Sequence, residues 1–111
     1  MRHIAISLTV VSLFGLLITA PLHAADAAAG KELFAKKCAT CHGAAGEGKD
    51  AIAKMMNVQM RPLGSQEVQA KSDADLAKVI KDGTGKMKPV SDLKEKDVQD
   101  IVAFLRTLAK K

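Results

Sequence analysis

The only two cysteines of the chain lie three residues apart and are followed directly by a histidine, in the run Cys38-Ala-Thr-Cys41-His42. Three kinds of chemistry use such a run: a disulfide, a metal site, or a covalently attached cofactor. A disulfide across this spacing would close a very small loop, so it would constrain the unfolded chain little. The pair is therefore a poor choice for a structural crosslink.

The metal and dithiol alternatives also lack partners. A structural zinc ion takes about four nitrogen or sulfur ligands, and residues 25–111 contain Cys38, Cys41 and His42 as their only cysteines and histidine. A thioredoxin-like dithiol belongs in a strand–helix–strand unit, and no alternating strand pattern is present. The run from Gly43 to Lys49 approaches a phosphate-binding loop, but Asp50 stands where serine or threonine is needed.

The remaining chemistry is the attachment of haem, because C-x-x-C-H is the signature of c-type haem proteins. Two sulfurs on one turn can form thioethers with the two vinyl groups, and the adjacent imidazole can bind the iron. A haem would also complete a core that is poor in aromatic residues, since only Phe34 and Phe104 follow residue 24. We therefore predict one covalent haem c on Cys38 and Cys41, with His42 as an iron ligand.

The sixth iron ligand cannot be a second histidine, because residues 25–111 contain only His42. Methionine, lysine or an open site remain. Met87 lies in a loop, with Gly85 before it and Pro89 after it, and a loop can aim a thioether at the iron. We predict Met87 as the ligand, with Met60 as its main rival. The earlier methionines are expected to fill gaps against the ring: Met55, Met56 and Met60.

Helices are predicted around these residues. Helical spacing indicates a first helix over 27–37, with one face formed by Gly30, Leu33, Phe34 and Lys37. Residues 43–50, with three glycines, are expected to form a loop, 51–65 to be irregular, and 66–71 to form a short helical turn.

Two further helices are expected after this middle region. Ser72 has the position of an N-cap, and Gly83 should end the helix that it starts. Its apolar positions are Leu76, Val79 and Ile80. The last helix is predicted over 95–109, with an apolar stripe of Val98, Ile101, Val102, Leu105 and Leu108. The fold class is therefore all-α.

With these residues in place, the segment 25–111 resembles a small bacterial class I cytochrome c with one haem. The resemblance rests on Gly30 and Phe34 in the first helix, the C-x-x-C-H run, the loop that carries Met87, and the final helix with "IVAFL". It implies a few helices wrapped around one haem, with the N- and C-terminal helices crossing. Gly30 and Phe104 match the crossing, and Phe34 and Ile101 would pack beside it.

The resemblance also implies a function and a further site residue. Members of the family usually carry single electrons between larger redox partners and are not enzymes. In many of them a proline carbonyl accepts a hydrogen bond from the proximal imidazole, and Pro62 is the candidate here. One departure is Lys88, which separates Met87 from Pro89 where many relatives have proline directly after methionine.

The first 24 residues have the build of a secretory signal peptide: basic Arg2, an apolar run over 4–20, and a small residue at Ala24. Cleavage is expected after Ala24, with Ala25 as the next choice, which leaves a cytochrome domain over 25–111 in the periplasm. The alternative is an uncleaved membrane tether, because the run is near the short end of a membrane span.

Charge bears on the partners. Removal of Arg2 lowers the net charge from +5 to +4, and lysines cluster in sequence near the attachment segment and the Met87 loop: Lys36, Lys37, Lys49, Lys54, Lys86 and Lys88. Two interpretations are open: these lysines steer the chain to acidic faces of redox partners, or they are ordinary solvated side chains whose field Glu47, Asp50 and Asp82 dilute. Nucleic-acid binding and stable membrane insertion after cleavage are not expected, and the protein is expected to be a monomer.

Two other functions remain compatible with the sequence. An open or labile sixth site would make the chain a gas sensor or a weak peroxidase. The chain could also serve as the haem subunit of a larger oxidoreductase.

Overall fold

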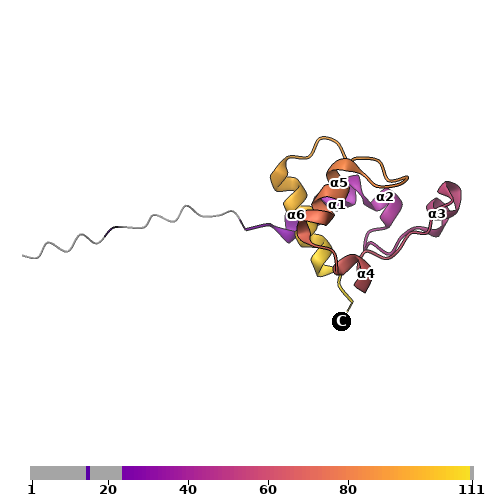
Figure 1. The fold of residues 1–111 in the computed structure, drawn as a ribbon, viewed down its shortest axis with the longest axis horizontal. Helices are drawn as coiled ribbons and strands as arrows, with labels where there is room; N and C mark the ends of the chain where they lie inside the picture. Colours follow the sequence, from indigo (N-terminus) through magenta and orange to yellow (C-terminus); the bar gives the residue numbers. More distant parts are fainter. Residues whose placement is uncertain (1–14, 16–23, 111) are drawn as a thin grey trace, which may run out of the picture.

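The computed structural model describes residues 24–110 and, before them, Gly15 alone. The predicted signal peptide therefore falls outside the described residues, apart from Gly15 and Ala24, and the expected cut after Ala24 lies at the edge of the described part. Within the described part the chain forms helices and loops (Figure 1), as predicted. The helices are α1 (Ala27–Lys37), α2 (Ala39–His42), α3 (Asp50–Met56), α4 (Gln66–Gln69), α5 (Asp73–Asp82) and α6 (Glu95–Thr107).

The two terminal helices cross as predicted, and the crossing depends on Gly30 of α1. A Cβ atom at this position would lie 1.8 Å from the carbonyl oxygen of Asp100 in α6. Close by, the rings of Phe34 and Phe104 pack with centroids 5.2 Å apart and planes inclined by 57°. Ile101 is also buried at this junction. The glycine lets the two backbones approach, and the aromatic pair fills the space beside them.

The core consists of apolar side chains from α1, α5 and α6. Its buried members are Phe34, Leu76, Ile80, Val98, Ile101, Val102, Phe104 and Leu105. The apolar stripes predicted for α5 and α6 supply most of these buried residues. Of the predicted positions, Val79 and Leu108 are only half-buried.

A buried carboxylate, Asp100, joins α6 to the start of α1. Asp100 is 1 % exposed, accepts a hydrogen bond from the Asp26 N–H at 2.8 Å, and pairs with Lys96 at 2.6 Å. The Asp26 carboxylate in turn caps α1 by accepting from the N–H groups of Ala28 and Ala29. The hydrogen bond from Asp26 and the ammonium of Lys96 hold the pKa of Asp100 below its usual value.

This lowered pKa predicts a pH-dependent contribution to stability. Because the folded protein favours the ionised form, Asp100 stabilises it fully above the ordinary carboxyl pKa of about 4, and the contribution is lost as the pH falls through the lower folded-state pKa. Replacing Asp100 by asparagine should cost about 1 kcal/mol at pH 7, because a charge-assisted bond becomes neutral. Urea unfolding at pH 7 and at successively lower pH should show the gap between variant and wild type closing.

The middle of the chain contains one helix that the sequence patterns did not predict. Residues 50–56 form α3, although the loop was expected to include Asp50 and the segment after it to be irregular. Asp50 lies in the first turn, where the helix dipole favours an acidic side chain, and Asn57 ends the helix with a left-handed φ of 51°. Figure 1 shows α3 projecting away from the other helices. Its missing apolar stripe explains why periodicity did not reveal it.

The predicted boundaries around α4, α5 and α6 agree closely with the structure. Ser72 caps α5 by accepting from the Asp75 N–H at 3.1 Å, and Gly83 ends it. The short turn at 66–71 is α4, and α6 ends two residues earlier than expected. Backbone pairing of Thr84 with Met87 is the one β-bridge recorded among the described residues. No helix in the described part is long and apolar enough to span a bilayer.

Candidate functional site

The C-x-x-C-H run forms a single helical turn. Cys38 lies between α1 and α2, and the N–H groups of Cys41 and His42 donate to its carbonyl oxygen at 3.2 and 3.0 Å. Gly43 then ends the turn with a φ of 81°. Cys38 and Cys41 are not joined by a disulfide. The turn places both sulfurs and the imidazole on one short piece of backbone, as the attachment hypothesis requires.

A cavity of about 820 Å³ opens beside this turn. Cys38, Cys41, His42 and Met87 all line it, although Met87 lies 45 positions after His42 in the chain. Core residues such as Leu76 and Ile101 also contribute to its wall. Cavities of this size commonly hold drug-sized molecules or cofactors. The structure therefore brings together the two cysteines and both predicted iron ligands around one cofactor-sized space.

The protonation states of the turn favour a metal-binding imidazole and argue against a redox dithiol. Burial lowers the pKa of His42 below its usual value, so its imidazole is neutral near pH 7, the form that binds metals. Burial raises the pKa of the Cys38 thiol to about 11, whereas redox-active dithiols need a lowered pKa. Three or more histidine, cysteine or acidic side chains do not gather anywhere in the described residues, so no zinc-type site is found there.

A tight turn presents Met87. Thr84 and Met87 exchange backbone hydrogen bonds at 2.9 and 3.0 Å, and Gly85 lies between them with a φ of 54°. A Cβ atom on Gly83 would lie 2.4 Å from the Met87 carbonyl oxygen. After the turn, the Val90 N–H donates to the carbonyl of Ile80 in α5. Both ends of the loop are therefore held, and the inserted Lys88 does not remove Met87 from the cavity.

The other methionines have different environments. Met55 is 74 % exposed, so the expectation that it fills a gap in the core was wrong. It lies on the projecting helix α3, where no other element covers it. Met56 and Met60 are half-buried and line the cavity. Met60 lies against Gly48, whose N–H donates to the His42 carbonyl at 2.6 Å, so Met60 adjoins the His42 segment.

The predicted hydrogen bond between His42 and Pro62 is not formed in this structure. The Nδ1 atom of His42 is buried without a hydrogen-bond partner, and the Pro62 carbonyl accepts from the Ser65 N–H at 3.0 Å. The next residue, Leu63, lines the cavity and donates its N–H to the Gly46 carbonyl at 2.8 Å. The segment that contains Pro62 is therefore tied to the loop that follows His42.

The charged residues that line the cavity are all basic: Lys37, Arg61, Lys71, Lys86 and Lys88. Lys37, Lys86 and Lys88 belong to the predicted cluster, while Lys36, Lys49 and Lys54 are exposed residues outside the lining. Arg61 and Lys71 were missed because they come from the middle of the chain, whose path periodicity did not predict. The role of Gly83 was also missed, since the sequence marked it only as the end of a helix.

These observations fit a haem. The cavity has the required size and an apolar wall, and both sulfurs lie on one turn. The imidazole of His42 lines the same cavity, and its buried Nδ1 has no hydrogen-bond partner. A thioether from Met87 adds a soft ligand suited to iron in cytochromes. The basic side chains that line the cavity can form ion pairs with the two carboxylates that haem c carries.

Comparisons with known proteins agree with this reading. Residues 27–109 match the family model for cytochrome c. Cytochrome c-554(547) of Halothiobacillus neapolitanus is 34 % identical over 91 residues, covering 77 % of this chain and 99 % of that protein. The solved KustC0563 c-type cytochrome is 30 % identical with a TM-score of 0.64, covering 73 % of this chain and 98 % of its own. The chain belongs to the cytochrome c family, as a small class I cytochrome that binds haem c covalently.

Proposed function

We propose that this electron-transfer haem protein is a periplasmic carrier of single electrons, in which His42 and Met87 would bind the haem iron. The observation that supports the proposal is the cavity that His42 and Met87 line together with Cys38 and Cys41. Haem c, when bound, supplies an iron that cycles between Fe(III) and Fe(II). Cys38 and Cys41 are the proposed thioether positions, and the short turn α2 keeps their spacing fixed.

Both side chains on the iron would leave it no position for another ligand. His42 is held at the end of α2 with a neutral imidazole, and the anchored turn from Thr84 to Met87 brings the thioether to the cavity. A thioether favours the reduced iron and so raises the potential relative to two nitrogen ligands. Apolar side chains such as Leu76 and Ile101 line the site. These roles suit a carrier, in which no substrate binds the metal.

Pro62 is the proposed acceptor for the Nδ1–H of His42. The buried Nδ1 of His42 has no hydrogen-bond partner, and this observation supports the proposal. An imidazole ligand usually donates its second N–H to a carbonyl or carboxylate. The Pro62 carbonyl accepts one hydrogen bond, from Ser65, and its second lone pair is available.

The spectrum of the purified protein tests the carrier proposal. With Met87 on the iron, the ferric form should be low-spin with a weak band at the red end of the spectrum, and the reduced form should not bind added carbon monoxide. A redox titration should follow a one-electron curve. A high-spin ferric protein whose reduced form binds carbon monoxide readily would instead support a gas sensor or weak peroxidase.

The proposed domain organisation is a signal peptide over 1–24 and a cytochrome domain over 25–111. The matched family region and α1 both begin at residue 27, shortly after the expected cut. N-terminal sequencing of the protein from a periplasmic fraction checks this, with Ala25 as the expected first residue. A chain that still carries its apolar N-terminal run would support the membrane tether.

The proposed partners are larger redox proteins with acidic docking faces, met by this chain as a monomer. Their recognition would use the basic side chains that line the cavity, because no acidic residue lines it with them. Such charges steer the encounter and raise the association rate at low ionic strength. The exposed acidic residues Glu47, Asp50 and Asp82 lie outside the lining. Glu67, also outside it, pairs with Arg61 at 2.6 Å and so offsets one of the basic charges.

Charge reversal at Lys88 tests this docking face. Lys88 lines the cavity and is exposed, so Lys88→Glu should slow electron exchange with an acidic redox protein roughly two- to fivefold at low ionic strength, with the difference vanishing at high salt. Lys78→Glu, on an exposed position of α5 outside the lining, is the matched control. Equal slowing by both variants would show that only the net charge of the protein matters, and it would contradict the proposed docking face.

A further inference from the structure

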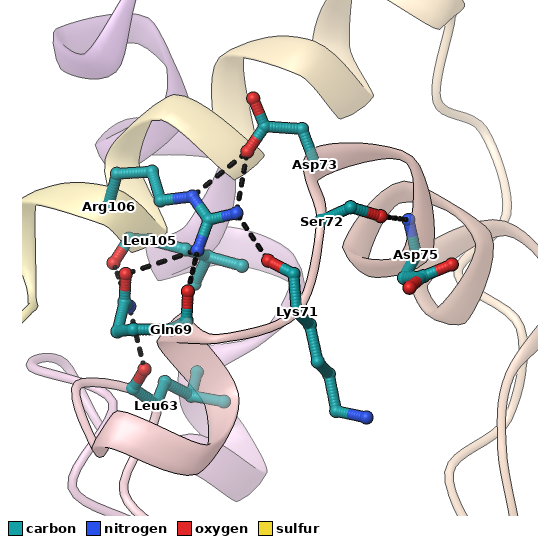
Figure 2. Close-up of polar contacts among 8 residues, drawn as sticks. All are labelled: Leu63, Gln69, Lys71, Ser72, Asp73, Asp75, Leu105 and Arg106. Carbon is teal, nitrogen blue, oxygen red and sulfur yellow. Dashed lines mark hydrogen bonds and ion pairs between the residues drawn. The ribbon is translucent and has the colours of Figure 1, made fainter.

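Arg106 of α6 forms a dense polar cluster outside the cavity (Figure 2). Its Nε and Nη2 atoms lie 2.9 and 2.8 Å from Oδ1 of Asp73, and Nη2 also donates to the Lys71 carbonyl at 2.6 Å. Its Nη1 donates to the carbonyl of Gln69 at 2.8 Å and lies 3.3 Å from its Oε1. The guanidinium therefore joins α6 to the end of α4 and the start of α5, a geometry that the planar fork of arginine suits and a lysine cannot reproduce.

Gln69 extends the cluster toward the cavity. Its Nε2 donates to the carbonyls of Leu63 and Leu105, at 2.9 and 2.8 Å. The side-chain amide is part-buried and all of its polar atoms are used, so its orientation is fixed. Leu63 belongs to the segment before α4, and Leu105 belongs to α6. One amide thus holds two distant stretches of backbone at a set separation.

The backbone held in this way is the wall of the haem cavity. Leu63, Lys71 and Leu105, whose carbonyls receive the hydrogen bonds, all line the cavity, whereas Gln69 and Arg106 do not. Leu63 also donates its N–H to Gly46, in the loop that follows His42. Two residues further, the Gly48 N–H donates to the carbonyl of His42 itself. An unbroken series of hydrogen bonds and short backbone links therefore runs from Arg106 to His42.

We infer that Gln69 and Arg106 are positioning residues for His42, and that they act by fixing the segment Arg61–Gly64, which Leu63 ties to the loop that follows His42. The inference rests on the proposed role of His42 as an iron ligand. Neither side chain touches the cavity, so the effect is transmitted through the Leu63 backbone. The cluster sets the environment of the buried Nδ1, and through it the electron donation of His42 to the iron, because the partner of the second imidazole nitrogen tunes a histidine ligand.

The test uses the haem-loaded protein and three graded variants. Gln69→Leu removes both bonds to Leu63 and Leu105, Arg106→Lys keeps the charge but loses the fork, and Asp73→Asn weakens only the outermost contact. Glu95→Gln is the control, because it removes the ion pair between Glu95 of the same helix α6 and Lys81. Neither residue of this ion pair lines the cavity. The readouts are the paramagnetically shifted ring-proton resonances of His42 in the oxidised protein, the midpoint potential, and the thermal midpoint.

We expect the His42 resonances and the potential to shift in the order Gln69→Leu, Arg106→Lys, Asp73→Asn, and to stay at their wild-type values in Glu95→Gln. If the three variants lower the thermal midpoint while the His42 resonances stay unchanged, the cluster is only structural and the inference is overturned. Should Gln69→Leu fail to fold, the other two variants decide the question by the same criterion. Failure of the proposed function would be seen separately, in the wild-type protein. That protein would then lack covalent haem, or its His42 resonances would not be shifted by the iron.

Discussion

Replacing Met87 by alanine should abolish the weak red band of the ferric protein and leave a high-spin iron that binds carbon monoxide when reduced. The midpoint potential should fall, because the thioether that favours the reduced iron is gone. Met87 is the methionine held in an anchored turn at the cavity, with Gly83 giving its backbone room to pass. Optical spectra of both redox states and a redox titration measure these changes.

Two other methionines provide controls for this experiment. Met60→Ala should leave the red band in place, because Met60 adjoins the His42 segment through Gly48. Met55→Ala should change neither spectrum nor stability, since this side chain is 74 % exposed on α3. A band that survives Met87→Ala and is lost in Met60→Ala would assign the sixth ligand to Met60 instead.

Substitution of Gly30 should produce a large loss of stability. Even alanine would place its Cβ 1.8 Å from the Asp100 carbonyl oxygen and 2.9 Å from the Ile101 nitrogen. Both atoms belong to the backbone of α6, so they cannot turn aside as a flexible side chain could. The terminal helices must separate, and the contact of Phe34 with Phe104 must loosen. We expect a loss of about 3 kcal/mol for Gly30→Ala and more for Gly30→Val.

Thermal unfolding of the haem-loaded protein measures this effect, which should appear as a decrease of the midpoint on the order of 10–20 °C. Lys31→Ala is the matched control, because this neighbouring position on α1 is exposed, and its midpoint should stay close to that of the wild type. If Gly30→Ala is as stable as this control, the close crossing of α1 and α6 is wrong.

The terminal helices could be predicted because local signals and long-range packing agree there. Gly30, Phe34 and the stripe on α6 have helical spacing, and the same side chains meet in the core. The helix α3 could not be predicted in this way, since it buries no apolar face and its sequence therefore has no amphipathic period. What reveals it is local: acidic Asp50 in the first turn and Asn57 at the end.

As with the fold, one part of the chemistry of the site could be predicted from the sequence and another part could not. The attachment turn is contiguous in sequence, so its spacing alone indicated haem, and the family comparisons confirm covalent haem c. The assignment of individual residues, including Met87 and Pro62, stays a prediction. The basic residues Arg61 and Lys71, and the link from Arg106 through Gln69 to Leu63, depend on where the middle of the chain lies in space. Sequence spacing carries no information about such contacts.

The central claim is that one haem is bound covalently to Cys38 and Cys41. The intact mass of the exported protein tests it most directly. Under denaturing conditions the mass should equal that of residues 25–111 plus one haem, and Cys38→Ser with Cys41→Ser should return the mass of the bare polypeptide. A wild-type mass equal to the polypeptide alone, in protein exported by cells that attach haem to other cytochromes, would contradict the account.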